Sequence, residues 1–204
     1  SPAPQTLPTP DGVYPAPADV SAYPDPNAQA PTAGPADPAF EGRDQTALES
    51  YKAALEYAEQ EFGPVRFYAI LPSHIMLQNF GNPPVEPGWF YKFQSEGDPA
   101  FHFVQVVDGL VLGARSLTPL GEEEVQEPID MDRVTIDSPE VFERFRQRAP
   151  ELGITIDERL TYDLELVQLP GSPAPVWSVV TPDTRQWLYS LNAVTGEEVP
   201  NPRS

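Results

Sequence analysis

The sequence contains no cysteine, few basic residues and no long apolar run. Without cysteine, the chain forms no disulfide, no zinc–thiolate site and no cysteine nucleophile. Only 12 of its 204 residues are Lys or Arg, against 31 Asp or Glu, so the formal net charge is −19. Such a charge repels phosphate backbones and argues against nucleic-acid binding. Basic protein partners or cations are favoured instead.

The longest apolar runs are too short to span a bilayer, so we expect no transmembrane segment. Residues 1–42 contain eleven prolines and neither Lys nor Arg. Proline fixes φ and lacks an N–H, so this composition predicts a disordered tether. The sequence begins at Ser1 and shows no signal segment. We therefore expect a removed signal. A Pro-rich tether of this kind resembles those that follow the lipidated cysteine of bacterial lipoproteins, which implies a lipid anchor upstream of Ser1, or those that begin a secreted domain. An ordinary linker from a larger protein is the alternative.

The first part of the chain with regular periodicity predicts one helix and four strands. Thr46 and Glu49 have the capping-box spacing, and apolar residues then recur at helical intervals up to Gly63-Pro64. The expected inward face consists of Ala47, Leu48, Tyr51, Leu55, Ala58 and Phe62. Strands follow at 65–71 and 110–117, with a Trp-containing hairpin at 89–107 between them.

A similar order returns after an acidic stretch. Ser138 at the N-cap and Pro139 at N1 predict a second helix start. Alternation over 160–166 predicts a strand that points Asp163 and Glu165 outward. A second Trp-containing hairpin follows at 176–192.

Both halves thus show the order helix, strand, hairpin. A helix on three or four antiparallel strands forms a two-layer α+β unit. The sequence therefore predicts an α+β fold with two similar helix-on-antiparallel-sheet units in tandem, after a disordered Pro-rich N-terminal tail. The predicted bounds are 1–42 for the tail, 43–120 for the first unit, 121–137 for an acidic connector and 138–204 for the second unit.

The second unit resembles the PepSY-type domain family. In that family the closing strand carries an acidic or amide residue, then Ala, then Thr-Gly-Glu. Here residues 192–199 read Asn-Ala-Val-Thr-Gly-Glu-Glu-Val, and Trp177 stands at the family's aromatic strand position. The resemblance covers about 138–199, with a degenerate copy over 44–117. It implies a bacterial lipoprotein or secreted protein: an extracytoplasmic, non-catalytic module that binds a protein and inhibits proteases or assists folding.

No cluster in the sequence predicts a catalytic reaction. His74 falls in a loop and His102 in a strand, and Ser73 beside His74 does not by itself make a triad. Six carboxylates between residues 122 and 132 could attract calcium, but the loop pattern of a calcium site is absent. We therefore predict no catalytic, cofactor-binding or metal-binding residues, and no enzyme.

Along the two hairpins, aromatic residues occupy both odd and even positions, so they are expected on both faces of the strands. Either both faces are covered, through packing between the halves, or some of these residues form an exposed partner-binding surface. That surface would consist of Trp89, Phe90, Tyr91, Trp177, Trp187 and Tyr189. The function predicted is protein binding in the cell envelope. One alternative is a small-ligand binder or hydrolase that uses the 72–88 loop and the hairpins, and another is a structural spacer.

Overall fold

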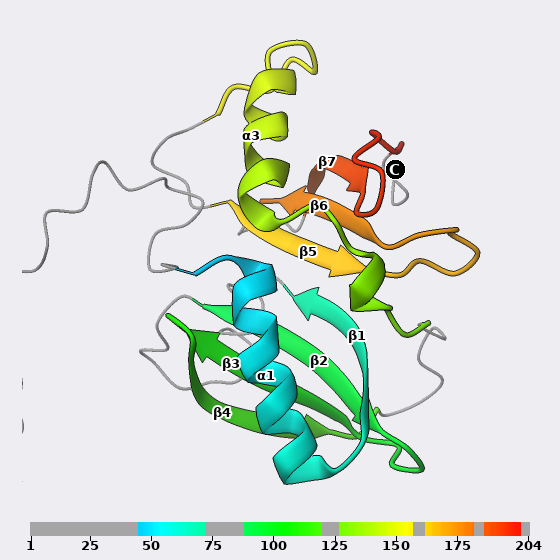
Figure 1. Cartoon of the computed structure of the whole chain (residues 1–204). Coiled ribbons are helices and arrows are strands. Elements are labelled where there is room, and N and C mark those ends of the chain that lie inside the picture. Colours follow the sequence, from blue (N-terminus) through cyan, green and yellow to red (C-terminus); the bar gives the residue numbers. More distant parts are fainter. Residues whose placement is uncertain (1–44, 72–87, 120–126, 157–161, 182–185, 201–204) are drawn as a thin grey trace, which may run out of the picture. The chain divides into compact units, whose positions relative to one another are not determined.

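The computed structural model describes residues 45–71, 88–119, 127–156, 162–181 and 186–200. The predicted tail at 1–42, the loop at 72–87 with His74, and part of the acidic connector lie outside these residues. Within them, two α-helices accompany seven strands, which form one antiparallel sheet in the order β4-β3-β2-β1-β5-β6-β7 (Figure 1). The predicted α+β class is confirmed. The elements are α1 (Ala47–Phe62), β1 (Val65–Leu71), β2 (Trp89–Ser95), β3 (Phe101–Val107), β4 (Leu110–Leu117), the 3-10 turn η1 (Met131–Arg133), α3 (Ser138–Arg148), β5 (Asp163–Val167), β6 (Val176–Val180) and β7 (Trp187–Asn192).

Helix α1 begins and ends where the sequence predicts. Thr46 and Glu49 form the capping box, and Gly63 with φ 78° ends the helix. Its fully buried stripe, however, consists of the small residues Ala47, Ser50, Ala54 and Ala58. The larger residues of the predicted face, Leu48, Tyr51, Leu55 and Phe62, are only partly buried beside that stripe. Small side chains let the helix approach a sheet face that is covered by aromatic rings.

Helix α3 begins one residue earlier than predicted. Asp137, rather than Ser138, is the N-cap, and its carboxylate accepts from Ser138 N–H at 2.6 Å. The Ser138 hydroxyl instead accepts from Ala47 N–H at 3.0 Å, and Asp137 Oδ1 also accepts from Leu48 N–H at 3.1 Å. The two residues therefore cap the start of α1 as well as that of α3.

The central strand β5 corrects a second expectation. Asp163 and Glu165 are only 1% and 7% exposed, so the predicted outward face of this strand is buried. Strand β5 pairs with β1 on one side and with β6 on the other. Antiparallel sheets often leave one face in water, but here the face of β5 that carries Asp163 and Glu165 also carries Val167 of the smaller cluster and is buried, which alternation of polar and apolar residues does not reveal.

One hydrophobic core unites both halves. It contains α1, α3 and residues of the central strands, among them Ile70, Leu164, Leu166 and Trp177. Val167 follows Leu166 and therefore points to the other face, where it belongs to a smaller cluster with Ala69, Val180 and Trp187. Both helices thus cover the same face of the sheet.

The tandem repeat stays a prediction, and one pair of hydrogen bonds supports it. The Trp89 indole N–H donates to Gln45 O at 2.8 Å, and the Trp177 indole N–H donates to Ile136 O at 2.8 Å. Each acceptor stands two residues before the first residue of its helix. The same bond therefore ties the second strand of each half to the start of its helix.

Candidate binding surface

The aromatic residues singled out from the sequence are core residues. Trp89, Phe90, Tyr91, Trp177, Trp187 and Tyr189 are all at most 6% exposed. The exposed aromatic surface is therefore absent from the structure, and both faces of these strands are covered, as the other interpretation expected. The physical reason is that pairing of β1 with β5 joins both hairpins into one sheet, and large rings are buried on each face of it, Trp177 in the core under the helices and Trp187 in the smaller cluster.

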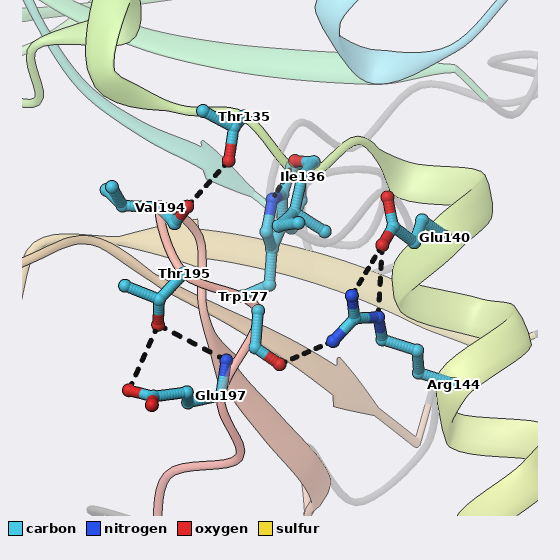
Figure 2. Close-up of polar contacts among 9 residues, drawn as sticks. Thr135, Ile136, Glu140, Arg144, Trp177, Val194, Thr195 and Glu197 are labelled. Carbon is cyan, nitrogen blue, oxygen red and sulfur yellow. Dashed lines mark hydrogen bonds and ion pairs between the residues drawn. The ribbon is translucent and has the colours of Figure 1, made fainter.

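The Thr-Gly-Glu motif forms a turn held by side chains from α3 and from the residues that precede it. The Arg144 guanidinium donates to Glu140 Oε1 at 2.6 Å and to the carbonyl of Gly196 at 2.5 Å. Thr195 Oγ1 accepts from Glu197 N–H at 3.3 Å, while Thr135 Oγ1 donates to Val194 O at 2.6 Å. Figure 2 shows Arg144 beside Glu140 of α3, and Thr135 beside Val194 of the turn. These contacts give the motif a structural role, because they fix the conformation of the turn.

Gly196 meets two requirements at this turn. Its φ is 73°, in the left-handed region that favours glycine, and a Cβ there would lie 2.6 Å from Arg144 Nη1. Gly196 N–H also donates to Asn192 O at 2.8 Å. The glycine of the motif is therefore explained by backbone conformation and by the close approach of Arg144.

His102 is buried, with 3% exposure, and has a partner on each ring nitrogen. Ser95 Oγ donates to Phe62 O at 3.0 Å, so it accepts from Nε2–H of His102, 3.2 Å away. Nδ1 then accepts from Ser116 Oγ at 2.8 Å. Burial lowers the pKa of His102, and the Asp98 carboxylate opposes this shift to a smaller extent. Through these two hydrogen bonds the ring joins β2, β3 and β4.

The two edges of the sheet differ in how they are covered. At β7, Asn192 N–H donates to Glu197 O and Val199 N–H donates to Ser190 O, so residues 197–199 lie along the strand. At β4, no described strand pairs with the outer edge. An uncovered edge offers a row of backbone N–H and C=O groups to another chain.

Strand β4 also presents apolar side chains to solvent. Leu110 and Leu112 are 69% and 54% exposed, and Leu117 is 50% exposed. Among the described residues, only one further large apolar side chain is exposed, Leu152 at 45%. The strand carries Arg115 and no acidic residue. Sequence reasoning placed this strand correctly but gave it no role, although three leucines in an acid-free strand at the end of the predicted unit were the available signal.

No family model, no curated protein and no solved structure matches this chain. Among the described residues, no group of three or more His, Asp or Glu side chains is arranged to hold a metal ion. In the same residues, no helix is long and apolar enough to cross a bilayer. The surface defined by the outer edge of β4 with Leu110, Leu112 and Leu117 is the candidate binding surface.

Proposed function

We propose that the protein is a non-catalytic binding module that adds an extended segment of a partner protein to the outer edge of β4. The observation that carries this proposal is the outer edge of β4, which no strand among the described residues pairs with, together with its three exposed leucines. In strand addition, backbone hydrogen bonds supply affinity and alternate side chains supply specificity. The partner segment is therefore extended, and it carries apolar side chains that pack on the leucines.

The net charge of the chain favours a basic partner protein. A net charge of −19 attracts basic proteins over distances of about 10 Å at moderate salt and speeds their association. Strand β4 itself has no carboxylate that an apolar segment would have to bury at a cost in desolvation. A basic protein with an extended apolar segment fits both features. Two copies of this chain repel each other, which disfavours pairing of β4 with itself.

The place and purpose of binding follow from the sequence resemblance. A PepSY-type module acts outside the cytoplasm, where it inhibits a protease or assists folding. Both kinds of partner contain extended segments that can add to a sheet edge. We propose the cell envelope or the extracellular medium as the site of action, and fractionation of cells that express the complete precursor tests it.

Capture of the partner tests the binding surface. The full chain and its Leu112→Lys variant are immobilised and exposed to envelope extract of the source organism at low and moderate salt. Lysine on an edge strand opposes pairing with another chain, so the variant should retain at least tenfold less of the captured protein. Leu152→Lys is the matched control, because Leu152 is also exposed but lies outside the sheet.

Two results would count against the proposal. One is capture that is reduced equally by Leu112→Lys and Leu152→Lys, which indicates nonspecific apolar adhesion. The other is the absence of any retained protein at either salt concentration. Thermal unfolding of both variants checks that the sheet remains intact.

A further inference from the structure

Strand β4 contains a bulge in the edge that is proposed to bind a partner. Gln105 of β3 pairs with Gly113, whereas the next residue, Val106, pairs with Val111. Leu112 is therefore the extra residue of a β-bulge. Gly113 has a φ of 151°, a conformation that residues with a side chain rarely adopt. The bulge thus depends on a glycine at this position.

Gly113 leaves a gap in the row of side chains on the face of β4 that points away from the helices. Val104 and Val106 of β3 belong to the core under the helices, and side chains alternate between the two faces of a strand. Gln105 between them therefore points to the opposite face, which position 113 shares because it pairs with Gln105. Apart from the chain neighbours of Gly113, no heavy atom of the described residues lies within 4 Å of a Cβ built on it. The position is therefore free to receive a side chain of another molecule.

The residues before and after this gap carry long, exposed side chains on the same face. Leu110 pairs with Val107, and Arg115 pairs with Phe103, so both share the face of Gln105. Leu110 is 69% exposed, and Arg115 is exposed as well. In a strand added to β4, the residue opposite position 113 has its diagonal neighbours about 7–8 Å away, within reach of an aromatic ring. A small or short side chain would leave the gap unfilled.

We propose that the partner segment carries a large aromatic side chain, which lies over Gly113 when the segment adds to β4. This inference rests on the proposed function of the β4 edge. The ring covers the glycine, as aromatic residues do opposite glycines of edge strands. It contacts Leu110 on one side and the Arg115 guanidinium on the other, where the cation favours an aromatic face over an aliphatic chain. Basic residues at the ends of the segment complement the net charge of −19.

Titration of the isotope-labelled full chain with three synthetic peptides, followed by NMR of the backbone amides, tests this preference. The peptides share the sequence Lys-Val-Thr-X-Thr-Val-Lys, in which X is Phe, Leu or Ala. In an extended peptide the two valines lie on the same face as X, and the lysines carry the positive charge. We expect shifts of the amides of residues 110–117. The Phe peptide should bind at least fivefold more tightly than the Leu peptide and at least tenfold more tightly than the Ala peptide.

A variant of the protein tests whether the ring lies over Gly113. Gly113→Ala places a methyl group in the gap, so it should reduce the advantage of the Phe peptide over the Leu peptide to less than twofold. Gly97→Ala is the matched control, because Gly97 also has a positive φ, 80°, but lies in the turn between β2 and β3. It should leave the preference for Phe unchanged. Thermal unfolding checks that both variants keep the fold, and the comparison of the three peptides on the unaltered chain does not depend on either variant.

The possible outcomes separate this inference from the proposed function. Equal affinity of the three peptides, with shifts in β4, would overturn the aromatic preference and leave strand addition intact. A preference for Phe that persists in a folded Gly113→Ala variant would overturn the position of the ring over Gly113. If no peptide shifts the amides of β4, the result counts against strand addition itself and against this inference with it.

Discussion

At the residue scale, Gly196 gives the sharpest stability prediction. Gly196→Ala places a methyl group at φ 73° and 2.6 Å from Arg144 Nη1. Gly153→Ala is the matched control, because its φ of 68° is similar and nothing lies within 4 Å of the added Cβ. In both variants, alanine at a positive φ should lower the free energy of unfolding by roughly 1 kcal/mol. In Gly196→Ala, the contact with Arg144 should lower it by about 1 kcal/mol more. Urea unfolding measures the free energy of unfolding of both variants. If the two variants lose the same stability, Arg144 moves aside without an energetic cost.

His102 makes stability depend on pH. Burial lowers its pKa below the ordinary value of 6.5, so the unfolded chain binds the proton more readily than the folded one. Stability contributed by the neutral ring is therefore present above pH 6.5 and is lost as the pH falls below it towards the folded-state pKa. The free energy of unfolding, measured between pH 7.5 and 5, should therefore decrease as the pH falls. The His102→Gln variant should show a smaller dependence on pH. His74→Gln is the control, and a slope that follows His74 instead would refute this assignment.

At the element scale, Asp137 links the two helices. Its carboxylate accepts from Ser138 N–H within α3 and from Leu48 N–H of α1. Asp137→Ala should therefore destabilise the fold by about 2 kcal/mol, because two helix starts lose an acceptor. Thr46→Ala breaks only the capping box of α1 and should cost about 1 kcal/mol. If chemical unfolding finds that Thr46→Ala costs as much as or more than Asp137→Ala, the link between the helices contributes nothing.

Local patterns predicted the elements well. The strands at Val65–Leu71 and Leu110–Leu117 have the bounds that alternation and the flanking glycines indicate. The start of helix α1 is indicated by its capping box, and its end is indicated by Gly63. These signals lie within a few residues of the element that they define, and a single sequence is enough to read them.

Long-range contacts account for what the sequence did not reveal. Asp163 looks like an outward residue of a half-exposed strand, and its burial depends on parts of the chain far from it in sequence that surround β5. Asp137 caps a helix that begins ninety residues earlier, which no local pattern encodes. The exposed leucines of β4 were visible in the sequence, but their meaning depends on β4 being an edge strand.

At the scale of the whole molecule, the described residues cover the β7 end of the sheet and leave the β4 end without a paired strand. Residues 197–199 lie along β7, and the Arg144 contact with Gly196 holds them there. Strand β4 has no such cover from the described residues, and it concentrates exposed leucines in a strand without acids. In a chain of net charge −19, this contrast is the reason why we propose the β4 edge as the binding surface.

Site-specific photo-crosslinking in the source organism tests this assignment most directly. A photoreactive phenylalanine analogue replaces Leu112 in one version of the full chain and Leu152 in another. The account predicts a covalent adduct with a defined protein from position 112, formed through an extended segment of that protein, and no such adduct from position 152. Crosslinks of equal yield and identical pattern from both positions, or none from position 112, would contradict it.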